Sequence, residues 1–145
     1  MFNLYPPFLG AGIRVNIARD VKTVDVTLGM HFWNRNYVKT HFGGSIYSMC
    51  DPFFFFLLIE NLGMDYIIWD KGASIKFIKP GRGTLHARFN IPDAELDRIR
   101  KELKPGEKIT PHFSVDVTDG EGDVVATVEK TIYVRRKPRD MGKGS

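Results

Sequence analysis

The sequence is poor in the features that define several classes of protein. Cys50 is the single cysteine among 145 residues, which excludes an intramolecular disulfide and a cysteine-rich zinc site. The longest apolar run is the seven residues from Phe53 to Ile59, whereas a membrane span needs roughly 18. No basic stretch precedes the early apolar residues, and Pro6-Pro7 would break the core of a signal peptide. We therefore expect a cytoplasmic protein with no membrane span.

The sequence also lacks a strong net charge over most of its length. Lysine and arginine number 21 against 17 aspartate and glutamate residues, for a net charge of +4. Five basic residues and one acidic residue follow Val134, so the excess lies at the end of the chain and residues 1–134 are neutral. A nucleic-acid partner is not expected, because it would require a basic surface with interleaved aromatic residues. Residues 136–145 are expected to form a basic, flexible tail.

The first third of the chain predicts an N-terminal element followed by a hairpin. Residues 1–10 are expected to form a short helix or packed arm that ends at Gly10. From Ile13 to Met30 apolar residues alternate with polar ones, with a break at residues 19–22. A period of two is typical of strands, so two antiparallel strands are expected here.

The rest of the chain predicts one long helix and a set of strands within a single domain, 1–145. Apolar residues between Gly43 and Gly63 follow helical spacing, and the second half of this segment is apolar on every side. Strands are expected at residues 66–69, 73–78, 84–91, 110–118 and 123–135, with an amphipathic helix beginning at Pro92-Asp93. This order favours an α+β fold in which an antiparallel sheet wraps around the apolar helix, and disfavours a doubly wound parallel sheet.

The residues from Asn36 to Asp51 are the most informative for chemistry. Gly43-Gly44 stands where a loop becomes a helix, so a ligand can approach the backbone closely there. Backbone N–H groups at a helix N-terminus can also polarise a carbonyl. Asp51 follows seven residues later, in an apolar neighbourhood where an unpartnered carboxylate is costly unless it serves a function.

A purely structural interpretation of Asp51 is also open. Aspartate followed by proline is a common start of a helix, with the carboxylate as the N-cap and the proline at the first helical position. Helical periodicity, however, already holds from Ile46 through Phe53. If one helix does run through this segment, Pro52 removes a backbone hydrogen bond and kinks it.

The Gly-Gly pair, six intervening residues and an aspartate on an apolar helix resemble the hot-dog-fold acyl-CoA thioesterases of the phenylacetyl-CoA type. A second match is Phe77-x-x-Pro80-x-x-Gly83, which is similar to the motif that follows the central helix in that superfamily. The resemblance covers residues 10–135. It is closest to a little-characterised branch of tetrameric acyl-CoA thioesterases.

The resemblance implies roles for individual residues. Asp51 would activate water or attack a thioester carbonyl directly. The Gly44 N–H would polarise the carbonyl oxygen, together with the Asn36 side chain. The site would be shared between two subunits, so a homodimer is the minimum functional unit and a homotetramer is the other possibility. No cofactor is implied, and the spacing of the four histidines predicts no metal site.

The sequence departs from the family pattern at two places. The family's His-Gly-Gly is replaced by Phe42-Gly43-Gly44, with His41 one residue earlier. Asp70 holds the position of a serine or threonine that often assists in the family. His41, Gly43, Asp70 and Arg82 are candidate substrate-binding residues, with Arg82 a candidate partner for coenzyme A phosphates.

Three hypotheses from different classes follow. The first is an enzyme that hydrolyses an acyl-CoA or related thioester. The second is a hot-dog protein that binds acyl-CoA or lipid without catalysis, which the displaced histidine and Asp70 favour. A dehydratase, which pairs a histidine with an acidic residue, is disfavoured by the position of His41.

Overall fold

The computed structural model describes residues 2–30, 41 and 43–139. Its elements in chain order are η1 (Phe2–Leu4), α1 (Pro6–Ala11), β1 (Ile13–Ile17), β2 (Thr23–Leu28), α2 (Gly43–Ser48), α3 (Phe53–Leu62), β3 (Tyr66–Phe77), β4 (Leu85–Asn90), α4 (Asp93–Glu102), β5 (Lys108–Ile109), β6 (His112–Thr118) and β7 (Val124–Arg136). No helix in this part of the chain has the length and apolar character needed to cross a membrane.

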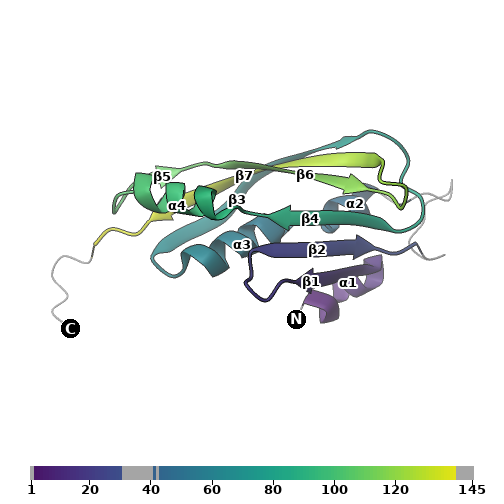
Figure 1. Ribbon diagram of the computed structural model, residues 1–145, viewed down its shortest axis with the longest axis horizontal. Helices are drawn as coiled ribbons and strands as arrows, with labels where there is room; N and C mark the ends of the chain where they lie inside the picture. The colour runs from purple at the N-terminus through teal and green to yellow at the C-terminus, as the bar shows by residue number, and fades with distance from the viewer. Residues whose placement is uncertain (1, 31–40, 42, 140–145) are drawn as a thin grey trace.

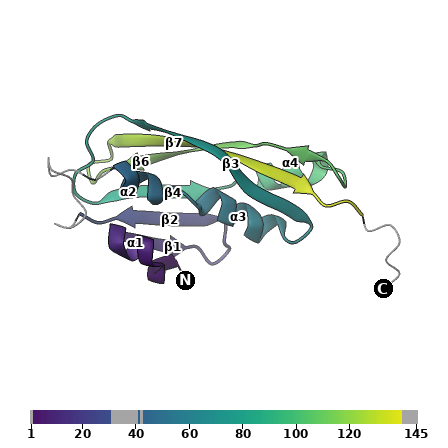
Figure 2. The same cartoon turned by 180° about the vertical axis from the view of Figure 1, so that it is seen from behind.

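One antiparallel sheet of seven strands forms the body of the molecule. Its order is β1-β2-β4-β6-β7-β3, and the short β5 pairs with β7. The sheet curves around the helical segment, with β2 on one side of α3 and β3 on the other (Figures 1 and 2). The α+β class predicted from the sequence is thus confirmed.

The helical segment from residue 43 to residue 62 is interrupted. α2 ends at Ser48 and α3 begins at Phe53, with a turn at residues 49–52 between them. Pro52 explains the break, because proline cannot donate the backbone hydrogen bond that a continuous helix would require at that position. The turn brings Asp51 out of the helix.

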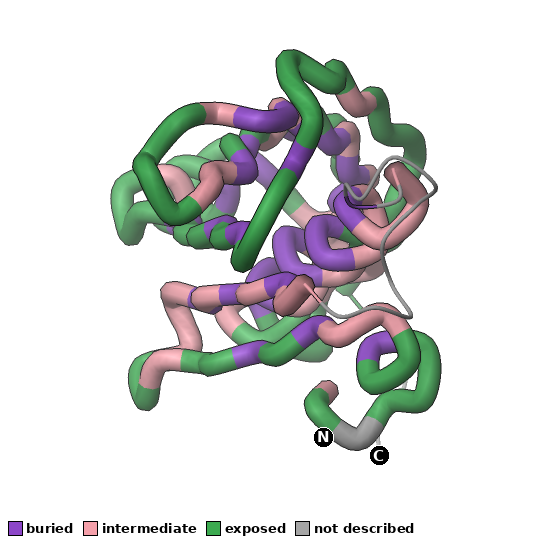
Figure 3. Tube along the Cα trace, turned by 90° about the vertical axis from the view of Figure 1, so that its right-hand side faces the viewer, coloured by how far each residue is buried: buried purple, intermediate pink, exposed green. Residues whose placement is uncertain are grey.

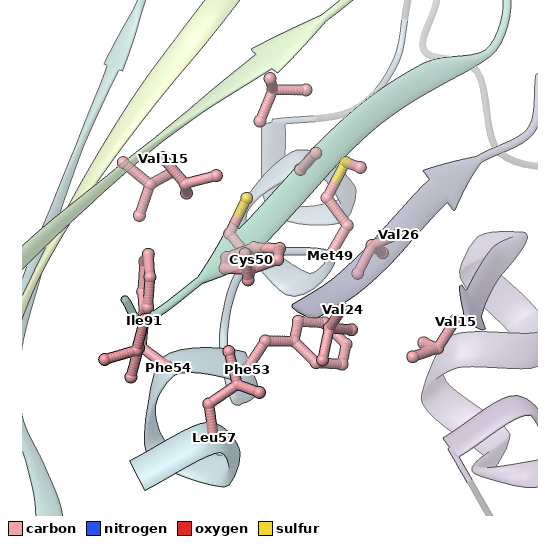
Figure 4. Close-up of a cluster of buried hydrophobic side chains, with 14 of the residues drawn as sticks. Val15, Val24, Val26, Met49, Cys50, Phe53, Phe54, Leu57, Ile91 and Val115 are labelled. Carbon is pink, nitrogen blue, oxygen red and sulfur yellow. The ribbon is translucent and has the colours of Figure 1, made fainter. Parts of the chain in front are cut away.

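The buried residues gather between the sheet and α3, as the purple segments of Figure 3 show. Phe53 is fully buried, and its ring lies 5.4 Å from Phe2, 5.9 Å from Phe8 and 5.2 Å from Phe89, centroid to centroid. Figure 4 shows Phe53, Phe54 and Leu57 pointing from α3 toward the strands. A phenylalanine of α3 therefore joins the N-terminal elements to the sheet.

Several boundaries differ from the predicted ones. α1 ends at Ala11 and is capped by Gly12 in the left-handed conformation, so Gly10 is not its end. The segments expected at 66–69 and 73–78 form one strand, β3, with an irregularity between Asp70 and Gly72. β7 extends to Arg136, whose guanidinium donates to the Leu103 carbonyl at 2.8 Å, so Arg136 belongs to the sheet rather than to a tail.

The β1–β2 turn holds Val21 at a φ of 55°. This left-handed conformation is unfavourable for a β-branched residue, and the Asn61 side chain supports it by donating to the Val21 carbonyl at 2.8 Å. Replacing Val21 by glycine is expected to raise the free energy of unfolding by about 0.5–1 kcal/mol, because glycine adopts positive φ without a steric penalty. Chemical denaturation measures the change.

Val24→Gly is the matched control for Val21→Gly. Val24 is fully buried in the extended strand β2, so the same substitution should destabilise the protein there. A lower stability of Val21→Gly than of the wild type would contradict the strain assigned to the turn.

Candidate active site

A buried lysine on the inner face of the sheet is the centre of the candidate site. Lys130 stands on β7 between Val128 and Ile132, both fully buried, and is itself only 2% exposed. Lys130 and His41 are the buried polar or charged residues in the described part of the chain. Because transfer of an ammonium group out of water costs several kcal/mol, a lysine in this position requires partners of opposite charge.

Asp51 is the first of these partners. It lies in the turn between α2 and α3, and its Oδ1 is 3.4 Å from Lys130 Nζ. The N-cap position of α3 is Pro52, and no side-chain hydrogen bond caps the helix. The capping interpretation of Asp51 is therefore wrong. Its side chain is 54% exposed, so one side of the carboxylate faces the buried lysine while much of it stays accessible.

Asp70 is the second partner. It lies on β3 opposite the buried Ile132, and its Oδ1 is 3.2 Å from Lys130 Nζ. The register of β3 against β7 shifts between Asp70 and Gly72, so one extra residue, Lys71, is accommodated there. This irregularity sets Asp70 on the same face of the sheet as Lys130. One ammonium group thus connects two carboxylates that are 19 positions apart in the sequence.

The ring of Tyr47 completes the surroundings of Lys130, with its centroid 5.9 Å from Nζ. At this distance a tyrosine ring attracts a cation through its electron-rich face. The ammonium is therefore held by two anions and one aromatic ring. The site therefore contains two partly exposed carboxylates, and a buried ammonium group holds both from the interior of the protein.

The two motifs that carry the resemblance meet in space at the other end of α2. A Cβ added at Gly43 would lie 3.0 Å from the Phe77 ring, so a larger residue would require the ring to shift by a few tenths of an ångström. His41 N–H donates to the Gly81 carbonyl at 2.9 Å, and its Nε2 lies 2.6 Å from the Gly83 carbonyl oxygen. His41 and Gly43 thus fix the turn of the Phe77–Gly83 motif against the start of α2.

A pocket of about 440 Å³ opens between these motifs. Its lining comprises His41, Gly43, Ile46, Phe77, Ile78, Lys79, Pro80 and Gly81. Asp51, Asp70 and Lys130 are not part of this lining. The pocket and the charged cluster therefore lie at opposite ends of the six-residue helix α2.

The remaining predicted residues are placed as follows. Gly44 lies in the first turn of α2, and its carbonyl accepts a hydrogen bond from Ser48 Oγ at 2.8 Å. Arg82 is exposed in the turn between β3 and β4, next to the pocket residue Gly81. Asn36 lies outside the described residues. Asp51 lies close to Asp70, and His41 lies close to Gly43. Within one chain, however, the first pair and the second pair are at different ends of α2.

Cys50 precedes Asp51 and is fully buried among the side chains of Figure 4. Burial raises the pKa of the Cys50 thiol to about 12, while the Lys130 ammonium acts in the opposite direction. A thiol of this kind is almost entirely protonated at neutral pH and is a poor nucleophile. A packing role for Cys50 explains its environment better than a catalytic one.

A thiol-labelling experiment tests this environment. At pH 8 the native protein should react with a disulfide reagent about 10³-fold more slowly than an ordinary cysteine, because the thiolate fraction is smaller by that factor. In denaturant the same thiol should react at the ordinary rate. Rapid labelling of the native protein would show that Cys50 is accessible.

One group of acidic residues could in principle hold a metal ion. Carboxylate oxygens of Asp119, Glu121 and Asp123 in the β6–β7 turn lie within 4.8 Å of one another. Lys79 Nζ, however, is 3.1 Å from Asp119 and 2.8 Å from Asp123, and this ammonium lowers the pKa of Asp119. The lysine already supplies the positive charge that a cation would bring, so no metal site is assigned here.

Sequence reasoning missed Lys130, the residue that joins the two aspartates. A signal was present, because Lys130 occupies an inward position in the alternation Val128, Lys130, Ile132, Val134. A lysine among apolar residues at a period of two is a candidate buried charge. Its partners could not be found in the same way, because they depend on the register of distant strands.

The fold defines the class of the protein, which is that of the hot-dog proteins. Solved structures with this fold superpose on most of the chain. A protein of unknown function from Pseudomonas aeruginosa, described as a probable thioesterase, has a TM-score of 0.75 at 16% identity and covers 87% of this chain and 84% of its own. A thioesterase from Haemophilus influenzae has a TM-score of 0.68 at 11% identity, covering 97% of this chain and 90% of its own.

The PaaI protein of the phenylacetic acid degradation operon of E. coli has a TM-score of 0.63 at 18% identity, covering 94% of this chain and 87% of its own. The chain belongs to the family described as a domain of unknown function, DUF4442, whose model matches residues 1–134. No curated protein matches the chain. At these identities the solved structures establish the fold, and the recognition of a hot-dog protein from its two motifs is confirmed.

Proposed function

We propose that the protein hydrolyses an acyl-CoA-type thioester at a site that contains Asp51. The observation that carries the proposal is the position of the Asp51 carboxylate, half exposed and held 3.4 Å from the buried Lys130 ammonium. The thioesterase names of the solved structures with this fold support the same reaction class. A carboxylate at the edge of an apolar core is suited to act on an electrophilic carbonyl.

In the proposed reaction a bond from oxygen to the thioester carbonyl carbon forms and the carbon–sulfur bond breaks. Asp51 removes a proton from the attacking water, or its carboxylate attacks first and water then hydrolyses the resulting anhydride. The leaving thiolate takes up a proton. Either course requires a hydrogen-bond donor beside the carbonyl oxygen, where negative charge develops.

The donor proposed for this oxygen is the Gly44 N–H, in the first turn of α2, with the Asn36 side chain as a second candidate. Gly44 and Asp51 of one chain lie toward opposite ends of α2. A complete site is therefore proposed to combine Asp51 of one chain with Gly44 of another, which makes a homodimer the smallest active unit.

The long strand β3 is the proposed contact between the two chains. It stands at the edge of the sheet, spans 12 residues, and has no buried residue. An edge strand of this length exposes unpaired backbone groups that a second copy can satisfy. Trp69 supports the proposal, because this half-exposed ring on β3 stacks on Tyr133 at 4.1 Å and extends the apolar surface of the edge.

The pocket beside α2 is the proposed entry for the substrate. Its wall includes Phe77 and Ile78, each about half exposed and suited to an apolar part of the ligand. Arg82 follows the pocket residue Gly81 and is the proposed partner of the coenzyme A phosphates. His41 and Gly43 then act by shaping the pocket.

Thiol release from a panel of acyl-CoA compounds tests the proposal. The panel should include short, long and aromatic acyl groups, and the purified protein should release free coenzyme A from at least one of them well above the uncatalysed rate. Absence of release from every member would contradict hydrolysis.

A second candidate function is the binding of acyl-CoA without turnover. It is favoured by Asp70, a carboxylate where the resemblance implies a serine or threonine, and by the ion pair that engages Asp51. Calorimetric binding of an acyl-CoA by a protein that releases no thiol would support this function. Absence of binding to the whole panel would count against both candidates.

A further inference from the structure

Lys130 is the part of the charged cluster that the resemblance does not account for. It stands at a fully enclosed position in an otherwise apolar row of β7. A buried ion pair is often no more stabilising than well-packed apolar residues of similar volume. The stability of the fold alone therefore does not account for a lysine at this position.

In each of the two ion pairs the Lys130 ammonium lies beside one oxygen of the carboxylate. Both use Oδ1 of the carboxylate, at 3.4 Å for Asp51 and 3.2 Å for Asp70. Among the described residues, no hydrogen bond engages Oδ2 of either group, so the second oxygen is left to accept a proton or hydrogen bond from another molecule. The ammonium is enclosed while both carboxylates are partly exposed, so it holds them from the protein side.

The elements that carry the two aspartates are also informative. Asp51 lies in a turn between two helices and Asp70 beside a strand irregularity, and neither position is fixed by regular backbone pairing alone. Lys130 comes from the middle of β7, which pairs with strands on both sides and is therefore rigidly placed. A rigid strand thus anchors two side chains on less regular segments.

We propose that Lys130 is a positioning residue of the active site, which fixes the Asp51 carboxylate for attack on the thioester and ties it to Asp70 through a shared ammonium. This inference rests on the proposed function. A carboxylate accepts hydrogen bonds but cannot donate them, so Asp70 cannot perform the donor role of a hydroxyl group. Lys130 supplies donors to the cluster instead.

The Lys130→Met variant tests the inference, because methionine preserves much of the side-chain volume without the charge. We expect kcat to fall about 100-fold with KM within about threefold of the wild type, since misplacement of a reacting group lowers the rate more than substrate binding. The thermal midpoint should be unchanged or higher, because both aspartates can be solvated once the ammonium is removed.

Lys108→Met is the matched control. Lys108 is exposed on β5, outside β3 and outside the pocket lining, and the same substitution there removes the same charge from the same sheet. This variant should keep kcat and KM. If Lys130→Met also keeps kcat within about threefold of the wild type, Lys130 does not position the reacting group. A fall in the thermal midpoint accompanied by a rise in KM would assign it a structural role and overturn the inference.

A crystal structure of Lys130→Met provides a readout that does not depend on turnover. We expect the backbone to be unchanged and the Asp51 carboxylate to leave its place beside residue 130. If both aspartates keep their positions without the ammonium, the inference is overturned. If the wild type hydrolyses no acyl-CoA, the proposed reaction fails, and this structure still decides whether Lys130 positions the two carboxylates.

Discussion

Replacing Asp51 by asparagine is expected to lower kcat for thioester hydrolysis about 10³-fold, since general bases and nucleophiles contribute factors of this order. The amide has nearly the same shape as the carboxylate but cannot accept the proton of water or form an acyl bond at neutral pH. KM should change little, because the proposed substrate-binding residues line the pocket and Asp51 is not one of them. Steady-state thiol release measures both constants.

Asp65→Asn is the control for Asp51→Asn. Asp65 is exposed just before β3, and its replacement makes the same change of charge away from Lys130. This variant should retain wild-type rates. Equal activity of Asp51→Asn and the wild type would remove Asp51 from the reaction and leave Asp70 as the carboxylate to examine.

Replacing Phe53 by alanine is expected to lower the free energy of unfolding by about 3–5 kcal/mol, the usual cost of removing a fully buried phenylalanine. The substitution removes ring contacts with η1, α1 and β4 at once. It also leaves a cavity next to the turn that carries Asp51. Denaturant titration measures the loss, and the marginal stability of small domains makes partial unfolding an expected result.

Phe77→Ala is the matched control for Phe53→Ala. Phe77 is 53% exposed, so the same deletion should cost no more than about 1.5 kcal/mol. A similar loss in both variants would contradict the placement of the core around α3.

Much of the fold could be predicted from local patterns. The alternation from Ile13 to Leu28 predicted the β1–β2 hairpin because one face of each strand is buried. The boundaries were less predictable. Pro52 indicated an irregularity, but sequence alone did not show whether the helix would be kinked or divided, because that depends on how α3 packs against β4 and β3.

The candidate site was predictable only in part. Asp51 and Asp70 could be selected because their residue types stand at informative places in the two motifs. Their connection through Lys130 could not, since it requires the pairing of β3 with β7 and the shift at Asp70. The contact between Gly43 and Phe77 was likewise hidden, although both residues had been singled out as parts of separate motifs.

The most direct test of the proposed site is a crystal structure of Asp51→Asn with the most rapidly hydrolysed acyl-CoA bound intact. We expect the thioester carbonyl to contact the side chain at position 51, beside Lys130 and Asp70, with its oxygen toward the Gly44 N–H of a second chain. A thioester bound in another place, such as the outer groove between β3, β6 and β7 that Ser74, His112 and Glu129 line, would contradict it.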